Sequence, residues 1–383
     1  MALAENYLPI ARPRIEQDEI DAVSEVLKSG WLTQGPWVKR FETAFATRHT
    51  AAHALATTSC TTALHLALAS LGIGPGDEVI VPAFTWISTA NVVVHCGANP
   101  VFVDVLADTC NIDPQAVAAK LSPRTRAIMP VHLFGLCADM DALRAVLPPD
   151  IAVIEDAACA AGASWRGTPA GALGDMGCFS FHPRKSVTCG EGGMLTVRDA
   201  KLAARAVVLR NHGAAIPEEV RHVAPRPFDM PEFEEAGFNY RMTDVQAAIG
   251  CIQLAKLDVF IDERTVLAEA YDARLAQLKW LTIPVRPAES RHALQAYVTQ
   301  VSEDAPAGRD GILEALHAAG IGGRAGTHSV TGLKVYRERF GTRPEDFPQA
   351  TRLQKQTLAL PLHNHMTLDD VDRVVLALKA LGH

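Results

Sequence analysis

The sequence predicts an α/β protein in which a large domain, built on a mainly parallel seven-stranded sheet, is followed by a smaller C-terminal α+β domain. Its 383 residues exceed what one compact core usually holds. Between about residues 50 and 200, short apolar runs alternate with helical patterns, as in a parallel sheet covered by helices. A second, shorter set of strand and helix patterns follows. We therefore expect a large domain over residues 1–255, which includes an N-terminal segment, and a small domain over residues 256–383.

Several of the expected strands are continuous apolar runs, which is typical of strands that are buried on both faces of a sheet. The seven runs of the large domain are His53–Thr58, Glu78–Pro82, Pro100–Val105, Ala127–His132, Ile151–Glu155, Gly177–Phe181 and Met194–Val197. Between the domains, Gln246–Ile261 predicts one long amphipathic helix. The segment Ala214–Ala236 is rich in proline and charge and predicts a loop beside the active site.

Composition narrows the possible classes of function. Hydrophobic residues make up 48% of the chain and charged residues 21%, which is ordinary for a globular enzyme. A net charge of -7 disfavours nucleic-acid binding, because phosphate backbones select basic surfaces. The eight cysteines lack the spacing of metal ligands, so we expect no metal site. The sequence shows neither a long apolar run nor a secretory signal, which predicts a cytoplasmic protein without membrane spans.

One expected strand, Ile151–Glu155, leads directly into Asp156. This places a carboxylate at the carboxyl edge of the sheet, where ligands bind in open α/β folds. Asp156 could simply cap a following helix. Alternatively, a partly buried carboxylate needs a cationic partner. The protonated pyridine nitrogen of pyridoxal 5'-phosphate (PLP) would supply that cation and absorb electrons when a substrate carbon loses its proton.

A second segment delivers a lysine to the same edge. The strand Gly177–Phe181 breaks at Pro183, and Lys185 follows in a turn that leads to Gly190-Glu-Gly-Gly193. Most lysines are solvated surface charges. A lysine that forms a Schiff base must instead be partly desolvated, so that its neutral amine is available as a nucleophile. Ser180, at the end of the strand, could donate to a phosphate oxygen.

Two further segments follow strands of the same expected sheet. The first, Thr57-Thr-Ser59-Cys60-Thr61-Thr62, has more hydroxyl groups than one helix cap needs, and the helix start that follows offers free N–H groups to a phosphate. The second contains Trp86, which could belong to the core or could stack on a flat heteroaromatic ring.

In this order, the four segments resemble the sugar aminotransferases of the DegT/StrS family, which are PLP-dependent transferases of fold type I. The resemblance runs from Ser29–Gly35 to Leu360–Asn364 and covers nearly the whole chain. Its specific parts are Glu155-Asp156-Ala-Ala, Phe179-Ser-Phe with Lys185, Gly190-Glu-Gly-Gly and Phe238-Asn239-Tyr-Arg-Met242.

The resemblance implies a role for each matching residue. Lys185 would hold PLP covalently as a Schiff base and would carry the proton between substrate and cofactor, while Asp156 would pair with the pyridine nitrogen. Asn239 would reach the phosphate of the neighbouring subunit, which implies a homodimer with shared active sites. The complete implied cofactor set is Cys60, Thr61, Trp86, Asp156, Cys159, Ser180, Lys185 and Asn239.

The chain departs from the family pattern at two of these positions. Cys159 stands three residues after the aspartate, where the family commonly has Gln or Glu, and Cys60 stands where it often has Gly. Cys60 is small enough to preserve the turn. Cys159 cannot reproduce an amide contact to the cofactor or the sugar, so the role of that contact is open here.

The resemblance implies transfer of an amino group from L-glutamate, or glutamine, to a keto group of a nucleotide-linked keto-deoxyhexose, with C-4 favoured. Alternatives are a C-3 keto-sugar or aminocyclitol aminotransferase, the dehydratase branch of the family, or a catalytically silent sugar-nucleotide-binding regulator. The dehydratases replace the lysine by histidine, so Lys185 argues against that branch. Expected wall residues for the sugar nucleotide are Trp31, Thr33, Gln34, Arg324 and His328.

Overall fold

A computed structural model describes residues 6–214, 230 and 232–382 of the chain. Its main sheet has seven strands, which confirms the expected fold class. Only β10 runs against the common direction, because β1 and β9 both pair with it in antiparallel register. In spatial order the strands are β1 (His53–Thr57), β10 (Gly193–Val197), β9 (Met176–Ser180), β6 (Ala152–Asp156), β5 (Thr125–Ile128), β2 (Glu78–Pro82) and β4 (Asn99–Val103).

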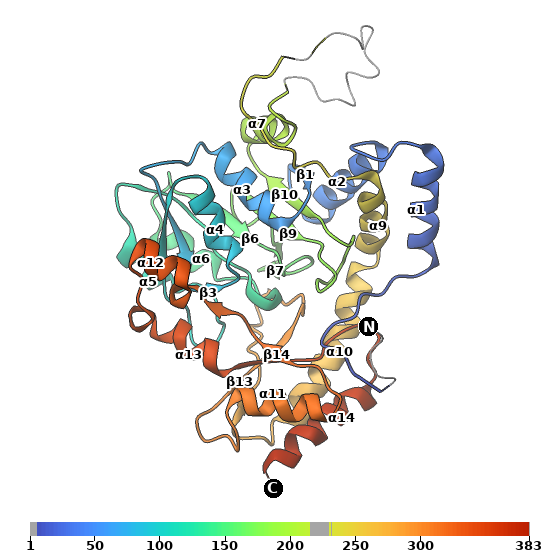
Figure 1. Cartoon of the computed structure of the whole chain (residues 1–383), viewed down its shortest axis with the longest axis vertical. Helices are drawn as coiled ribbons and strands as arrows, with labels where there is room; N and C mark the ends of the chain where they lie inside the picture. Colours follow the sequence, from blue (N-terminus) through green and yellow to red (C-terminus); the bar gives the residue numbers. More distant parts are fainter. Residues whose placement is uncertain (1–5, 215–229, 231, 383) are drawn as a thin grey trace.

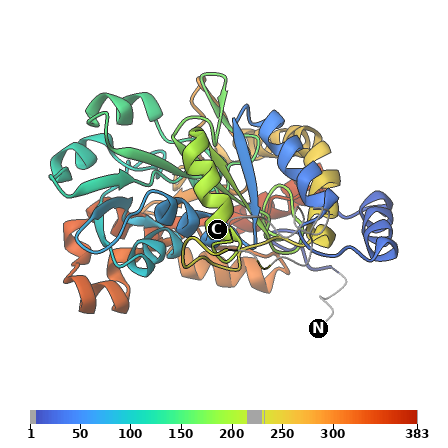
Figure 2. The same cartoon turned by 90° about the horizontal axis from the view of Figure 1, so that it is seen from above.

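Each face of this sheet carries its own hydrophobic core, because successive residues of a strand point to opposite sides. Ile80 and Val153 belong to one core, whereas their neighbours Val81 and Ile154 belong to the other. Figure 2 shows helices on either side of the strands. The first face is covered by α2 (Pro36–Arg48), α5 (Pro114–Lys120), α6 (Met140–Val146) and α9 (Asp244–Ala255), and the second by α3 (Cys60–Ser70), α4 (Ser88–His95) and α7 (Ala200–Arg210).

The C-terminal part has a smaller sheet and a third core. Four strands form this sheet in the order β11 (Leu281–Thr282), β13 (Tyr297–Val301), β16 (Thr357–Leu360) and β14 (Arg324–Ala325). Three helices pack with it: α10 (Leu257–Leu275), α11 (Arg309–Ala318) and α14 (Leu368–Lys379). Figure 1 shows this part below the main sheet, with α11 and α14 at the lower end of the molecule.

The chain crosses between the two parts more than once. Near the N-terminus, Leu8 forms a bridge to Ile321 and belongs to the C-terminal core. In the other direction, α12 (Lys334–Phe340) and α13 (Pro348–Gln356) pack against the main sheet, where the Tyr336 ring meets the edge of Phe102. The boundary near residue 255 remains a prediction.

The single helix expected over residues 246–261 is two helices. Helix α9 ends at Ala255 and α10 begins at Leu257, with Lys256 between them at φ -91° and ψ -4°. The Lys256 ammonium bonds to Glu16, Asp18 and Glu19, so this junction is tied to the start of α1 (Gln17–Ser29). A period of hydrophobic residues cannot reveal such a junction, because the apolar spacing continues through it.

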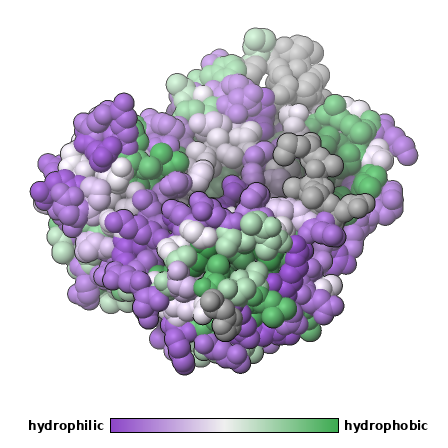
Figure 3. Space-filling view, turned by 60° about the horizontal axis from the view of Figure 1, so that its bottom comes forward, coloured by the Kyte–Doolittle hydropathy of each residue, from purple (hydrophilic) through white to green (hydrophobic). Residues whose placement is uncertain are grey.

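The loop expected over residues 214–236 lies largely outside the described residues. Within the part of the chain that the structure covers, no helix is long and apolar enough to cross a membrane. The face on the side of the C-terminal helices is largely hydrophilic, with a hydrophobic area near its middle (Figure 3).

Candidate active site

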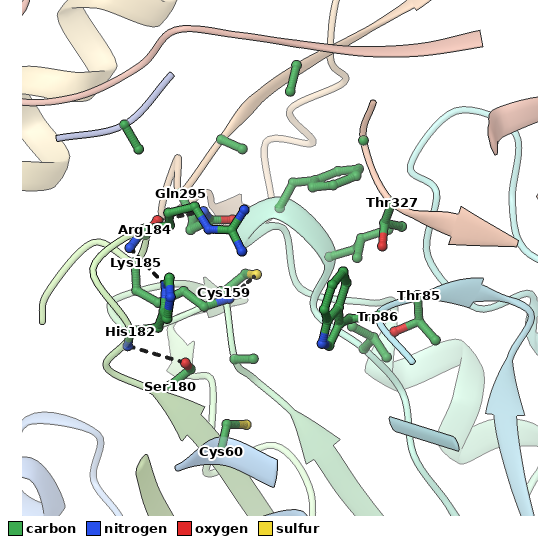
Figure 4. Close-up of a pocket in the computed structure, with 18 of the residues that line it drawn as sticks. Cys60, Thr85, Trp86, Cys159, Ser180, His182, Arg184, Lys185, Gln295 and Thr327 are labelled. Atoms are coloured by element: carbon green, nitrogen blue, oxygen red, sulfur yellow. Dashed lines mark hydrogen bonds between the residues drawn. The ribbon is translucent and has the colours of Figure 1, made fainter. Parts of the chain in front are cut away.

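A cavity of about 390 Å³ opens where the carboxyl ends of the parallel strands meet the C-terminal part. This is the edge at which open α/β sheets bind ligands. Figure 4 shows Lys185, Arg184 and Cys159 on one wall and Trp86, Thr85 and Thr327 on the wall across from them. Of the sequence-predicted residues, the cavity brings together Cys60, Thr61, Trp86, Asp156, Cys159, Ser180, Lys185 and Arg324.

Asp156 ends β6 and is only 4% exposed. The Thr89 hydroxyl donates to its Oδ2 at 2.7 Å, and the Ala158 N–H donates to its Oδ1 at 3.2 Å. Burial raises the pKa of Asp156, while the hydrogen bonds from Thr89 and Ala158 and the positive charge of Lys185 oppose this rise. No helix follows directly in residues 157–163, so the helix-cap interpretation of Asp156 is wrong.

Sequence reasoning missed the residues that hold Asp156 in place. Thr89 lies in the first turn of α4, three residues after Trp86, and its hydroxyl is 3.0 Å from that of Thr85. The threonines of this segment indicated available hydroxyl donors. Only the folded structure shows that the hydroxyl of Thr89 reaches the carboxylate of Asp156.

A buried pair lies beside Asp156. The Nε2 of His132 is 2.8 Å from Glu155, and the Ala138 N–H donates to Nδ1 of the same ring. Since Nδ1 accepts, Nε2 must carry a proton and donate to Glu155. The backbone N–H of His132 donates to the Asp156 carbonyl at 3.0 Å. The pair therefore anchors the strand end that presents Asp156.

Lys185 reaches the cavity from the neighbouring strand. Strand β9 lies parallel to β6, with Cys178 opposite Asp156, and ends at Ser180. A turn then brings the Lys185 N–H to the His182 carbonyl at 2.8 Å. The Lys185 side chain is partly buried, and its Nζ donates to Cys159 Sγ at 3.1 Å. The amine is thus held on the cavity wall by a thiol.

The start of α3 forms another wall. Ser59 caps this helix, and its side chain accepts from the N–H of Thr62. The loop can approach β10 this closely because position 193 is glycine, where a Cβ would lie 2.3 Å from the carbonyl carbon of Ser59. The N–H groups of Cys60 and Thr61 belong to the first turn, where a helix has no internal acceptors to offer.

The sequence suggested that most hydroxyl groups of this turn are free to bind a phosphate. In the structure, several of them bond within the turn instead. Thr57 donates to the Ser59 carbonyl, and Thr58 and Thr62 bond to each other at 3.0 Å. Hydrogen bonds within the turn therefore occupy more hydroxyl groups than expected. Thr61 is the threonine of this turn that lines the cavity.

Trp86 does not belong to the core, because 51% of it is exposed. Its ring faces that of His328 at a centroid distance of 5.6 Å. His328 lies on β15 (His328–Ser329), which pairs with β3 (Phe84–Thr85). An exposed indole at the cavity wall can cover the face of a flat ligand.

Five sequence-predicted residues do not line the cavity of the described chain: Trp31, Thr33, Gln34, Asn239 and His328. The Trp31 indole donates to the Thr33 carbonyl at 2.9 Å, and Thr33 bridges to Thr243. Gln34 is buried at φ 50°. Asn239 is exposed and bridges to Asn211. In the described chain the first four of these residues are separate from the cavity, whereas His328 borders it through Trp86.

The residues of the cavity fit PLP. The Asp156 carboxylate suits a protonated ring nitrogen, because burial without a full counter-charge is costly. The Lys185 amine suits the aldehyde, and the α3 N-terminus with Ser180 suits the phosphate. The three groups approach one cavity from separate elements, as a ligand with three distinct ends requires.

Residues 13–379 match the DegT/DnrJ/EryC1/StrS aminotransferase family. The chain is 41% identical over 377 residues to the spore coat polysaccharide biosynthesis protein SpsC of Bacillus subtilis, covering 98% of this chain and 97% of that protein. Its fold is similar to the PLP form of the putative sugar aminotransferase Spr1654 from Streptococcus pneumoniae, with a TM-score of 0.91 and 27% identity over 98% of both chains. An aminotransferase from Psychrobacter cryohalolentis gives a TM-score of 0.90 and 33% identity, again over 98% of both chains.

Fold, cavity and relatives together define a PLP-dependent aminotransferase. The chain belongs to the DegT/DnrJ/EryC1/StrS aminotransferase family.

Proposed function

We propose that the protein transfers an amino group from L-glutamate to a keto group of a nucleotide-linked keto-deoxyhexose, with C-4 as the favoured position. The observation that carries this proposal is that the side chains of Lys185 and Asp156 line the same cavity. The relatives support a sugar substrate, because SpsC is named for polysaccharide biosynthesis and Spr1654 for a putative sugar aminotransferase.

In the proposed mechanism, PLP supplies an aldehyde that takes up the amino group and a ring that absorbs electrons when the substrate carbon loses its proton. Lys185 would hold the cofactor through its amine and would move that proton as a general base and acid. Asp156 stabilises the positive charge on the ring nitrogen. The α3 N-terminus, Thr61 and Ser180 bind the phosphate, and Trp86 covers the ring.

We also propose a homodimer with shared sites. The cavity of the same chain is not lined by Asn239 or by residues Trp31 to Gln34. This is expected if these residues contact the active site of a second copy. Apolar side chains are exposed on α1 and just after it, namely Ile20, Leu27, Trp31 and Leu32. The buried Oε1 of Gln34 and Nε of Arg241 have no hydrogen-bond partner among the described residues. Such a surface favours contact with a second copy.

The substrate is tested by incubating the holoenzyme and L-glutamate with 4-keto and 3-keto nucleotide sugars and a keto-cyclitol, and by reading the aminated product with mass spectrometry and NMR. Amination of the 4-keto sugar supports the proposal. Amination of the 3-keto sugar or the cyclitol would assign one of the alternative activities instead. Absence of any aminated product, with the cofactor bound, would favour the regulator hypothesis.

A further inference from the structure

Two guanidinium groups line the same cavity as Lys185. Arg184 precedes this lysine in the turn after β9, and Arg324 comes from β14 of the C-terminal sheet. The positive charges are close enough that Arg184 lowers the pKa of Arg324, after the larger effect of burial. Two like charges that converge on one cavity disfavour each other unless an anion lies between them.

Neither arginine has a carboxylate partner among the described residues. Arg324 donates only to backbone carbonyls, from Nε to Ala325 and from Nη2 to Gly326, both at 3.2 Å. The buried Arg210, in contrast, bonds to Glu42 at 2.5 Å. Guanidinium groups bind carboxylates through several strong hydrogen bonds, so the cavity pair has unused capacity for an anionic ligand.

Besides Asp156, a second acidic residue, Glu191, lines the cavity. Burial lowers the pKa of His182, and the negative charge of Glu191 opposes part of this decrease. Among the described residues, neither Glu191 nor Asp156 forms an ion pair with Arg184 or Arg324, so no carboxylate of the chain neutralises these guanidinium groups directly.

The location of the pair indicates which anion it takes. Arg184 is the chain neighbour of Lys185, and Arg324 lines the same cavity as Cys159, whose Sγ lies 3.1 Å from the Lys185 amine. An anion held here is therefore close to the atom that exchanges amino groups. In an amino acid, a carboxylate lies within a few bonds of the amine. In a nucleotide sugar, the diphosphate is separated from a C-4 keto group by the hexose ring.

We propose that Arg324 and Arg184 bind the two carboxylates of a dicarboxylic amino donor and thereby select L-glutamate over L-glutamine. The proposal rests on the proposed transamination and adds the residues that set donor specificity. Arg184, the chain neighbour of Lys185, binds the α-carboxylate that both amino acids share, and Arg324 binds the side-chain carboxylate that only glutamate has. Replacing that carboxylate by an amide leaves one guanidinium without its charged partner.

The test measures the donor half-reaction by the change in cofactor absorbance. In Arg324→Met, whose side chain is apolar and of similar length, kcat/KM for L-glutamate should fall roughly ten- to hundredfold, and that for L-glutamine much less. The KM for the keto sugar, measured in the other half-reaction, should stay unchanged. Arg337→Met, at an exposed position of α12, serves as the matched control and should behave as the wild type.

Two outcomes would overturn the proposal: an equal loss with both donors, or a loss confined to the keto sugar, which would assign the arginines to the diphosphate. A binding experiment separates this proposal from the proposed activity. Glutarate, a dicarboxylate without an amine, should bind to the wild-type holoenzyme in calorimetry and bind at least about tenfold more weakly to Arg324→Met. That result would support the subsite even if no donor were turned over, and equal binding would overturn it.

Discussion

The Nζ of Lys185 donates to Sγ of Cys159 at 3.1 Å, from a turn after β9 to a turn after β6. The thiol occupies the position three residues after Asp156 where the family resemblance leads one to expect an amide or carboxylate. It is therefore placed to hold the amine whenever the lysine is not bound to the cofactor. We propose that this contact orients the amine of Lys185, a role for Cys159 that differs from the one its position implies.

Replacing Cys159 tests this orientation. Cys159→Ala removes the partner of the amine and should slow the donor half-reaction by about fivefold, the equivalent of one hydrogen bond. Cys159→Ser keeps an acceptor and should recover most of that rate. Stopped-flow absorbance of the cofactor measures both, with Cys96→Ala, away from the cavity, as a control. Equal rates in all four proteins would show that the thiol does not orient the amine.

Lys185 itself should be indispensable. Lys185→Ala removes both the covalent attachment and the base, so turnover should fall by at least about a hundredfold. Borohydride should fix the cofactor to the wild-type chain, and peptide mass spectrometry should find it on Lys185. Circular dichroism checks that the variant keeps its fold. Covalent label at another lysine would remove Lys185 from its proposed role.

Thr89 should tune the charge of Asp156. Its hydroxyl donates to the carboxylate at 2.7 Å, and this bond opposes the rise in pKa that burial causes. Thr89→Val removes the bond and should raise the pKa of Asp156 further. The carboxylate would then protonate at higher pH, so the acid limb of the kcat profile should move to higher pH. Thr89→Ser should restore the original profile, and coincident profiles for Val and wild type would exclude this role.

The main outlines of the site followed from the sequence because they depend on strand ends. Asp156 and Lys185 each follow an apolar run, and parallel neighbours deliver such residues to one edge. The contacts of Thr89, His132 and Cys159 could not be predicted, because each joins residues from separate loops whose relative positions only the folded sheet fixes. The same reason explains why the sequence did not separate the residues from Trp31 to Gln34 from the cavity.

Helix junctions and caps were harder to predict than the sheet. The periodicity of residues 246–261 continues across Lys256, although the helix there is interrupted. Counting hydroxyl groups near Ser59 overestimated the number available to a ligand, since Thr57, Thr58 and Thr62 bond within the turn. Local composition gives the type of groups at a position, but the assignment of each donor to an acceptor needs coordinates.

His49 should make the protein less stable in acid. Its ring is fully buried against Phe45 at a centroid distance of 4.0 Å, and burial lowers its pKa to about 3. Between the ordinary value of 6.5 and about 3, the unfolded chain takes up a proton that the native ring does not. The contribution of His49 to the free energy of unfolding is therefore fully present above pH 6.5. It decreases as the pH drops, by about 2 kcal/mol at about pH 5.

The variant His49→Phe tests this effect, because a phenyl ring can stack in the same place without titrating. The variant also lacks Nε2, a buried atom of His49 that has no hydrogen-bond partner among the described residues. Urea unfolding at about pH 7 and about pH 5 should show a smaller loss of stability in the variant, by about 2 kcal/mol. The buried His292, whose pKa is likewise lowered to about 3, remains in both proteins and should contribute equally to each. If wild type and variant lost the same free energy of unfolding, His49 would have to be protonated in the native state, and its burial would not control the acid limit.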